Sequence, residues 1–501
     1  MGISTVVLLV AVATFALVGI SQAGRKAIDL EDYMVSRNQI GGPMALATVT
    51  ASALGAWILF SPAEAGSLFG GITAILGYCI GSAAAVFLFV FIGPRLRQIM
   101  PWGHSLNEYV RHRFGSRSSS QGQSSTKSVW GQAMYWLTVA VMLLYMFVYL
   151  TAELTAIAQT LRLVADVPLI VTSLVVITAV FLYTTYGGLK VTILTDALQF
   201  LLIVPLLLIC FGATIVLLGG FGEAFAPVAE KVPEFLSFSN IDGLRFGATL
   251  MIAIIAAELF NQGNWQRVYA CQDDPTVRRA FLGSSLVILP LLFLSGLLGL
   301  ISAGFEISGT TAFFDLLQTL SVPGWLVGAV VLLAVALVMS SLDSLLNGIS
   351  AVFTVDLLRL SNQPNQVLLI SRVLTVAVGI PAVAIAAQGY SVLYLFFVAD
   401  LICAALLFPI LLSFYNRYQS SANAFCSSVL GIAVGTLFFP KPDFSPLVNI
   451  SGGGDLLNSF AAALVASTLV SLIWCSIDTR FRQGNNKPFN YSNLSRVKPY
   501  S

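Results

Sequence analysis

The chain has 501 residues, of which 57% are hydrophobic and only 10% charged. Soluble proteins carry about 25% charged residues, so this composition excludes a water-soluble enzyme and predicts an integral membrane protein. The net charge of +2 is too small to indicate a nucleic-acid partner. The six cysteines form no CxxC pair and the two histidines lie in a polar loop, so we expect neither a disulfide framework nor a zinc site.

Thirteen segments are apolar and long enough to cross a bilayer, which takes about 20 residues. In chain order they are 3–23, 44–61, 67–93, 130–160, 167–187, 196–220, 244–262, 280–304, 323–355, 366–388, 389–414, 424–440 and 456–478. The division at residue 388 and the shortness of segment 424–440 leave the count open by one. The first segment could be a cleaved signal peptide, but it lacks a basic start, so we expect a retained helix.

Basic residues predict the orientation, because Lys and Arg are retained on the cytoplasmic side. With the N-terminus outside, 21 of the 25 basic residues fall in loops assigned to the inside. The four left outside are Arg162, Lys231, Arg245 and Lys441. We therefore expect the N-terminus outside the cell and the C-terminus inside.

Two of the apolar segments are interrupted, at residues 61–66 and at residues 261–265. Each interruption belongs to the first member of a set of five segments, the second to sixth and the seventh to eleventh. Helices broken at matching places indicate an inverted-repeat secondary transporter, whose unwound backbone binds ion and solute near the bilayer midplane. Two ordinary loops would also explain the pattern.

Six carboxylates lie within or beside apolar segments, where an unpaired charge costs about 2.5 kcal/mol or more. They are Glu64, Glu153, Asp196, Glu258, Asp343 and Asp400. In the ninth segment Ser340, Asp343, Ser344 and Asn347 share one helix face. Hydrogen bonding between helices would account for the Ser and Asn residues. A carboxylate among hydroxyls also favours a site for an alkali cation or a proton.

The order of several motifs resembles the sodium/solute symporter family, which includes the bacterial proline permease and the sodium/glucose cotransporters. The motifs are LEDYMVSRNQIGG (30–42), ATVTASALGAWILFSPAEAG (47–66), YTTYGGLKVTILTD (183–196), FNQGNWQRVYA (260–270) and VMSSLDSLLNG (338–348). The resemblance implies an all-α fold with a LeuT-type five-plus-five inverted repeat. It divides the chain into a first helix with a cytoplasmic loop (1–43), two repeat halves (44–220 and 221–414), and two peripheral helices with a cytoplasmic tail (415–501).

The resemblance also implies a sodium site. Its ligands would be the carbonyl oxygens of Ala51, Leu54 and Leu337 and the hydroxyls of Ser340 and Ser341. One departure is Ala53, where proline permeases carry an aspartate, so ion coupling could differ in detail.

Two further assignments follow from the resemblance, each with a simpler explanation. Asp196, Asp343 and Ser344 form a candidate second cation site, although Asp196 could be only a charge at the membrane interface. Arg37 matches an arginine at the family's cytoplasmic gate, although it could be only a positive-inside anchor.

The expected solute site lies beside the first interruption. Its candidate residues are Trp57, Ser61, Glu64, Tyr149, Asn261 and Gln262. Tyr149 matches a tyrosine implicated in solute binding in proline permeases. Gly263 stands where sodium/sugar relatives place a gating tyrosine, which argues weakly against a sugar. Glu64 and Glu153 would suit an amine, although each could instead hydrogen-bond to a neighbouring helix.

These observations predict a multi-pass plasma-membrane symporter that uses sodium to move a small organic solute by alternating access. Proline or another small amino or organic acid, or an amine, is the expected solute, and protons could replace sodium. We expect no organic cofactor and no obligate protein partner. An ion channel or a solute-gated receptor is the alternative. An intramembrane enzyme is disfavoured because the sequence contains no HExxH motif.

Overall fold

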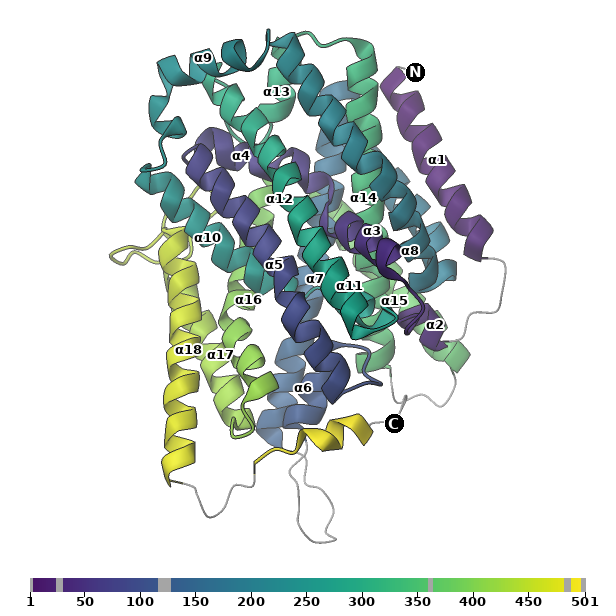
Figure 1. Ribbon diagram of the computed structural model, residues 1–501, viewed down its shortest axis with the longest axis vertical. Helices are drawn as coiled ribbons and strands as arrows, with labels where there is room; N and C mark the ends of the chain where they lie inside the picture. Colours follow the sequence, from purple (N-terminus) through teal and green to yellow (C-terminus); the bar gives the residue numbers. More distant parts are fainter. Residues whose placement is uncertain (1–2, 24–29, 116–127, 359–363, 482–487, 497–501) are drawn as a thin grey trace.

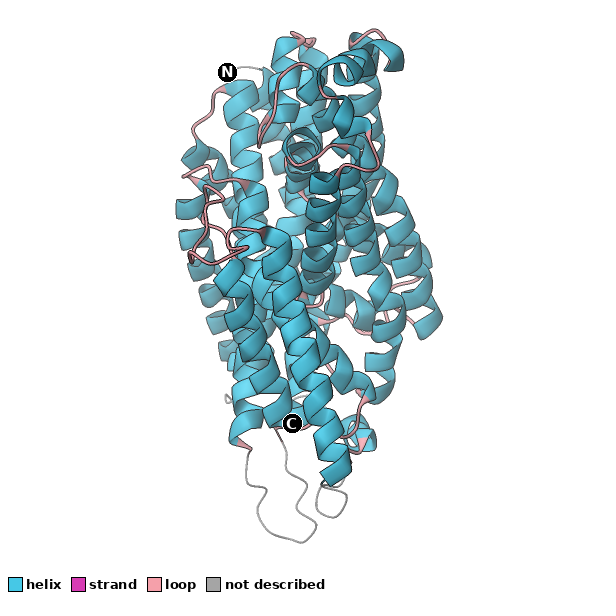
Figure 2. Ribbon diagram, turned by 90° about the vertical axis from the view of Figure 1, so that its left-hand side faces the viewer, coloured by secondary structure: helices cyan, strands magenta, loops and turns pink. Residues whose placement is uncertain are grey.

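The structure is a computed structural model, and it describes residues 3–23, 30–115, 128–358, 364–481 and 488–496. These residues form an all-helical bundle without a β-strand, so the predicted all-α class is confirmed (Figure 1). The long helices run roughly along the longest axis of the molecule (Figure 2).

The helices follow one another along the chain with short connections. The α-helices are α1 (Ile3–Ala23), α2 (Leu30–Met34), α3 (Gly42–Ala53), α4 (Ser61–Leu68), α5 (Ile72–Ile99), α6 (Leu106–Phe114), α7 (Val129–Ala165), α8 (Leu169–Leu217), α9 (Phe221–Lys231), α10 (Ile241–Glu258), α11 (Gln262–Ala270), α12 (Asp274–Gly304), α13 (Ala312–Thr319), α14 (Gly324–Val352), α15 (Pro364–Ala386), α16 (Val392–Tyr415), α17 (Ser421–Phe438) and α18 (Leu456–Phe481). The short segments are the 3-10 turns η1 (Ala56–Leu59), η2 (Pro233–Leu236) and η4 (Tyr491–Arg496) and the π-helical turn η3 (Phe353–Leu357).

Among the described residues, nine helices are long and apolar enough to cross a membrane, and two bent helix pairs raise the number to eleven. Two further apolar helices, 5–21 and 169–184, are shorter. Each of the thirteen predicted segments overlaps one of these elements. How many of them span the bilayer, and on which side the termini lie, remain predictions.

The first bent pair consists of α3 and the continuous stretch of η1 and α4, at an angle of 57°. The sequence predicted its interruption at residues 61–66, and this position was wrong. The chain leaves the helix at Leu54 and Gly55, whereas Ser61 begins a new helix. Pro62 lies in the first turn of α4, where its missing amide hydrogen would have no partner anyway, so it starts a helix rather than breaking one.

The second bent pair consists of α10 and α11, also at 57°. α10 ends at Glu258 and α11 begins at Gln262, so the break lies at the start of the predicted interruption. Asn261 caps α11, because its Oδ1 accepts a hydrogen bond from the backbone N–H of Gly263 at 3.0 Å. This break is encoded locally by a capping residue.

α8 joins two segments that the sequence separated, and it is kinked at Gly188. Gly188 has φ 58° and ψ −164°, which a helix interior does not allow. A β-carbon at this position would lie 2.6 Å from the ring of Tyr33, so glycine also allows α2 to pack against the kink.

α14 is the central helix of the bundle, with all residues from 333 to 352 buried. It packs against α1, α7 and α8, and it also contacts α3 and η1 at the first break. Its polar face is therefore buried with the rest of the helix. Buried hydroxyl and carboxyl groups need partners inside the protein, which makes this face a candidate for binding chemistry.

Small residues bring the helices around α14 together. A β-carbon at Gly77 of α5 would lie 2.1 Å from the Cα of Gly247 in α10, and one at Gly299 of α12 would lie 2.1 Å from the carbonyl oxygen of Ala63 in α4. Backbones that approach so closely gain van der Waals contact, the main attraction between helices in a membrane. α17 and α18 lie at the flank of the bundle opposite α1 (Figure 1).

Candidate functional site

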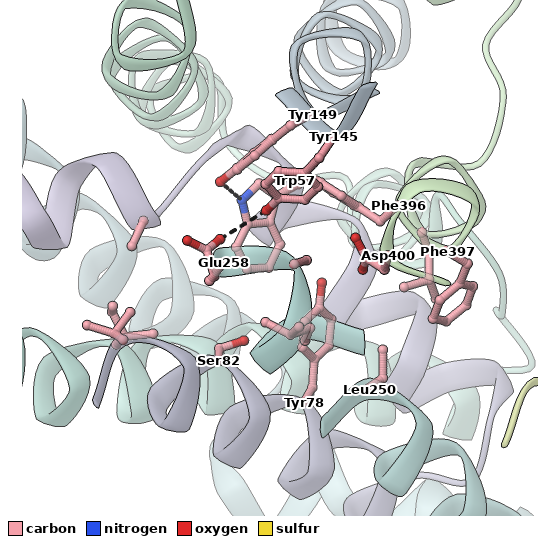
Figure 3. Close-up of a pocket in the computed structure, with 16 residues that line it drawn as sticks. Trp57, Tyr78, Ser82, Tyr145, Tyr149, Leu250, Glu258, Phe396, Phe397 and Asp400 are labelled. Carbon is pink, nitrogen blue, oxygen red and sulfur yellow. Dashed lines mark hydrogen bonds between the residues drawn. The ribbon is translucent and has the colours of Figure 1, made fainter. Parts of the chain in front are cut away.

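A cavity lies beside the first break, between α3, η1, α5, α7, α10, α12 and α16 (Figure 3). It contains about 580 Å³ of empty space, part of it open to solvent. Its lining residues are Ala53, Trp57, Tyr78, Ser82, Val86, Tyr145, Tyr149, Leu250, Ile254, Ala257, Glu258, Ile288, Leu393, Phe396, Phe397 and Asp400. Clefts between the helices of a bundle are common places for small-molecule sites, so this cavity is the candidate solute site.

Six aromatic side chains form one large part of the wall of the cavity. The indole N–H of Trp57 donates a hydrogen bond to the hydroxyl of Tyr149 at 3.1 Å. The Trp57 ring stacks on Tyr78 with a centroid distance of 5.7 Å, and Phe396 meets both Trp57 and Tyr149 edge-on. Faces of aromatic rings attract cations, particularly ammonium groups shielded from water. The wall therefore suits a cationic solute.

Two carboxylates, Glu258 on α10 and Asp400 on α16, lie on two sides of the cavity (Figure 3). Glu258 accepts hydrogen bonds from the hydroxyl of Tyr145 at 3.1 Å and from the side-chain amides of Asn264 at 2.6 Å and Asn261 at 3.2 Å. Asp400 is only 3% exposed, and its Oδ1 has no hydrogen-bond partner. The described lining contains no basic residue, so the cavity presents acidic groups to an entering molecule.

Two of the predicted solute residues, Trp57 and Tyr149, line this cavity. The other four, Ser61, Glu64, Asn261 and Gln262, lie outside its lining. Asn261 does not line the cavity itself, but its side-chain amide donates a hydrogen bond to Glu258, which does. Gln262 donates a hydrogen bond to the carbonyl oxygen of His104 at 2.7 Å, on another side of α11.

Glu64 connects helix ends rather than lining the cavity. Its Oε1 accepts hydrogen bonds from the hydroxyls of Thr310 and Ser391, both at 3.2 Å. These contacts link α4 to the loop before α13 and to the start of α16. They agree with the simpler explanation for Glu64, a carboxylate that bonds to neighbouring segments.

Glu153 on α7 supports the first break. Its Oε2 accepts a hydrogen bond from the backbone N–H of Ala56 at 2.8 Å. A β-carbon at Gly55 would lie only 1.8 Å from its Oε1, so the carboxylate occupies space that only glycine leaves open. The contact satisfies a donor at the unwound start of η1.

Sequence analysis did not assign Tyr78, Ser82, Tyr145 and Phe396 to the solute site, although all four line the cavity. They belong to α5, α7 and α16, and no local pattern connects these helices with the break. Glu258 and Asp400 did carry a signal, since both are carboxylates in apolar segments. Their position in one cavity depends on helix packing.

The predicted sodium ligands lie where α14 passes the first break. Ala51 is in the last turn of α3 and Leu54 follows that helix, so their carbonyls border the unwound chain. On α14, Ser341 donates a hydrogen bond to the carbonyl oxygen of Leu337 at 3.0 Å. The hydroxyl of Ser340 is fully buried and lacks a hydrogen-bond partner. Neutral hydroxyl and carbonyl oxygens in a buried position fit a small monovalent cation.

The candidate second cation site contains a protein cation that the sequence analysis placed in a cytoplasmic loop. Arg267 of α11 is fully buried, and its Nη2 lies 2.6 Å from Asp196 Oδ2 and 2.6 Å from Ser344 Oγ. Its Nε donates to the hydroxyl of Thr48 at 2.9 Å, and its Nη1 donates to the carbonyl oxygen of Gly263 at 3.0 Å. The guanidinium thus contacts two of the three predicted residues.

The third predicted residue, Asp343, is held by other partners. Its Oδ2 accepts hydrogen bonds from the hydroxyls of Tyr183 and Thr195, both on α8 and both at 3.0 Å. Thr48 also donates to Asp196 at 2.5 Å. α3, α8, α11 and α14 therefore meet in one continuous polar network.

Arg37, the predicted gate residue, joins three segments at one end of the bundle. It forms an ion pair with Glu31 at 2.7 Å and donates to the carbonyl oxygens of Pro101 and Gly103 at 2.7 and 2.9 Å. Its guanidinium also lies 5.0 Å from the centre of the Tyr269 ring. Arg37 is thus held by protein contacts on several sides, more than a solvated anchor requires.

His104 extends this cluster between two carboxylates, at 2.7 Å from Glu31 and 3.0 Å from Glu108. Burial favours the neutral imidazole, but hydrogen bonds and the charges of Glu108 and Glu31 outweigh it and raise the pKa of His104 to about 9. For Glu31, burial opposes ionisation, but His104 and Arg37 lower its pKa to about 2. The cluster is therefore charged at neutral pH.

A helical bundle with two broken helices beside an interhelical cavity has the architecture of a secondary transporter. The profile of the sodium:solute symporter family matches residues 33–431, and the chain belongs to this family. Together with the apolar helices, this shows that the protein is a multi-pass integral membrane protein of a transporter family. The family resemblance inferred from the motifs is confirmed.

Individual relatives differ in the solutes that they are named for. The chain is 27% identical over 423 residues to the spermidine transporter DUR31 of Candida albicans, with 82% of this chain and 75% of that protein covered. It is 24% identical over 394 residues to the sodium/mannose cotransporter SLC5A10 of Bos taurus, with 66% of this chain and 61% of that protein covered.

Solved structures show the same fold. A Na⁺-coupled sialic acid symporter in a substrate-bound outward-open state aligns with a TM-score of 0.77 at 18% identity, over 98% of this chain and 99% of that chain. MHP1, a nucleobase-cation-symport-1 family transporter, aligns with a TM-score of 0.57 at 15% identity, over 92% of this chain and 98% of that chain.

Proposed function

We propose that this protein uses the sodium gradient to import an amine-bearing organic cation across the plasma membrane by alternating access. The observation that carries the choice of solute is Asp400, a buried carboxylate whose Oδ1 lacks a hydrogen bond, in a cavity whose described lining contains aromatic rings and no basic residue. An unpaired charge is costly in such a place, and a solute ammonium group would remove that cost.

The same lining disfavours an organic acid. A carboxylate-bearing solute would meet Glu258 and Asp400 without a cationic partner among the described lining residues. The sequence left proline, other small amino or organic acids and amines as candidate solutes. The lining of the cavity favours the amines among them. The similarity to a spermidine transporter supports an amine as well.

Glu258 and Asp400 together favour a solute with more than one amino group. They come from different helices and lie on two sides of the aromatic wall (Figure 3). Glu258 is already held by three hydrogen bonds, whereas Asp400 Oδ1 has none, so Asp400 is the stronger anchor. A linear diamine or polyamine could place one ammonium group near each carboxylate and its methylene chain against the rings.

Sodium would bind next to this cavity, through the carbonyls of Ala51, Leu54 and Leu337 and the hydroxyls of Ser340 and Ser341. Trp57 follows Leu54 by three residues and lies in η1, the 3-10 turn directly after the unwound segment. An ion that orders this segment would also fix the Trp57 ring in the solute cavity. Such shared ordering is a physical basis for coupling, because each ligand reduces the cost of binding the other.

For the topology, we propose the two repeat halves 44–220 and 221–414, with residues 1–43 before them, residues 415–501 after them, the N-terminus outside and the C-terminus inside. The two bent pairs support this division, because each would be the first membrane-crossing segment of its half and both bend by 57°. The cluster of Arg37, Glu31, His104 and Glu108 would then close the cytoplasmic end of the solute pathway.

The proposal is tested by uptake of radiolabelled spermidine into proteoliposomes that contain the purified protein. An inward sodium gradient should drive accumulation, and a sodium ionophore should abolish it. Asp400→Asn should raise the half-saturating spermidine concentration at least about tenfold, since it removes a buried ionic partner. Asp443→Asn is the matched control, because Asp443 lies in an exposed loop and contacts Ser445.

Two results would contradict this function. Uptake that proceeds equally well without sodium would rule out sodium coupling. Normal spermidine affinity in Asp400→Asn, or strong competition by a dicarboxylic acid, would rule out the assignment of the solute.

A further inference from the structure

Arg267 is the feature that the transport function leaves unexplained. Its side chain is fully buried, and it lies in α11, directly after the second break. The guanidinium projects into the network between α3, α8 and α14 rather than into the solute cavity. A buried arginine needs a specific set of oxygen partners, and here the partners are the groups that would otherwise ligate a metal cation.

The oxygens around Arg267 are of the kind that a sodium ion prefers. Asp196 offers a carboxylate at 2.6 Å, Ser344 a hydroxyl at 2.6 Å and Thr48 a hydroxyl at 2.9 Å. Hard carboxylate and hydroxyl oxygens bind ammonium-type and alkali cations alike, because the attraction is largely electrostatic. The guanidinium contacts Asp196 Oδ2, Ser344 Oγ and Thr48 Oγ1 itself, so a sodium ion would have to displace it to bind these three atoms.

We infer that Arg267 is a tethered cation that takes the place of a second coupling sodium at Asp196 and Ser344. The inference rests on the proposed sodium coupling and adds its stoichiometry, one sodium ion per transport cycle. A metal ion would leave the site on the far side of the membrane, but an arginine side chain stays with the protein. The positive charge of Arg267 therefore stays at this site throughout the transport cycle.

Tethering also has a structural consequence. Arg267 belongs to the second bent pair, whereas Thr48 belongs to the first, and Asp196 and Ser344 lie on α8 and α14. One guanidinium therefore connects both broken helices directly and contacts α8 and α14 as well. A free sodium ion could bind the same oxygens, but it would lack the covalent link to α11.

The test is a direct measurement of sodium binding to the full-length protein in detergent, with ²²Na⁺ alone as the probe. Wild type should bind one sodium ion per chain with a Hill coefficient near one. Arg267→Gln should gain a second site, and its Hill coefficient should rise toward two. Arg267→Lys keeps a cation in place and should remain at one.

A second, milder variant keeps the inference testable if Arg267→Gln does not fold. Ser344→Ala should leave the sodium affinity within about twofold of wild type, because Ser344 contacts the arginine and not sodium. Two sodium ions bound to wild type would overturn the inference, as would a Ser344→Ala affinity reduced tenfold or a folded Arg267→Gln variant with one site. The absence of any sodium binding to wild type would instead overturn sodium coupling itself.

Discussion

At Ser340 a hydroxyl group lies wholly inside the bundle and forms no hydrogen bond, whereas its neighbour Ser341 bonds to the carbonyl oxygen of Leu337. Buried hydroxyls are normally paired, since leaving one unpaired costs about 1–3 kcal/mol. An oxygen kept in this state is available to a ligand. Replacing Ser340 should therefore affect ion binding, whereas replacing Ser341 should also remove a hydrogen bond within the protein.

Ser340→Ala should weaken the apparent sodium affinity about tenfold, equivalent to about 1.4 kcal/mol, because one ion ligand is lost. It should leave the thermal stability without sodium unchanged or slightly higher, because no hydrogen bond within the protein is broken and an unpaired buried hydroxyl is removed. Sodium dependence of solute uptake and thermal unfolding of the purified protein provide the two measurements. Ser350→Ala is the control on the same helix, where the hydroxyl instead bonds to Ser371. Unchanged sodium dependence in Ser340→Ala would remove this residue from the ion site.

On the scale of an element, the unwound segment between α3 and η1 depends on a contact that is distant in sequence. Glu153 lies 97 positions beyond Ala56, yet its carboxylate accepts the hydrogen bond of that backbone N–H. Gly55 provides the room for it. The shape of this segment is therefore set jointly by the local sequence and by α7.

Gly55→Ala should destabilise the protein by about 2 kcal/mol or more, because its β-carbon would displace Glu153 and leave a buried donor unpaired. The expected readout is a lower midpoint of thermal unfolding in detergent. Combining it with Glu153→Ala should cost less than the sum of the single changes, since the two residues compete for one space. Gly42→Ala is the control, as nothing lies within 4 Å of the added carbon. Strictly additive effects would show that Glu153 and Gly55 act separately.

The two breaks show why sequence reasoning succeeds at one place and fails at another. The second was predicted nearly in place, because Asn261 caps α11 through a contact two residues away. The first was predicted too late, because Pro62 resembles a helix breaker while the true break depends on Glu153. In the cavity, Trp57 was predicted from its place beside the first interruption, and Tyr149 from the family resemblance. That α16, with Asp400, also lines the cavity could not be predicted, because it depends on how helices distant in the sequence pack together.

On the scale of the whole molecule, charged groups join separate segments at one end of the bundle. Arg37 and Glu31 connect the α2 region to the loop after α5, and His104 brings in α6 through Glu108. The α-helices in the middle of the bundle carry few such ion pairs. The contacts that hold this end together are ion pairs, so their strength changes when His104 or the carboxylates gain or lose a proton. The apolar packing between helices does not change in this way.

The pKa values define the pH range in which this cluster stabilises the fold. His104 has its pKa raised to about 9, so its contribution is complete below about pH 6.5 and is lost as the pH rises through 9. The contribution of Glu31, with a pKa lowered to about 2, is present above about pH 4.5 and is lost only near pH 2. Between pH 6 and pH 9.5 wild type should lose about 3 kcal/mol of stability through His104. Thermal unfolding across this range should show a steeper decline for wild type than for His104→Asn, and parallel curves would refute the assignment.

The acidic lining of the cavity has a consequence for the driving force of transport. Glu258 and Asp400 stay with the protein, so a solute with two positive charges and one sodium ion would carry three charges inward per cycle. Each charge gains about 2.3 kcal/mol for every 100 mV of membrane potential. Three charges would therefore gain about 7 kcal/mol, enough for roughly a 10⁵-fold concentration ratio. The membrane voltage, more than the difference in sodium concentration, would then set how far the solute accumulates.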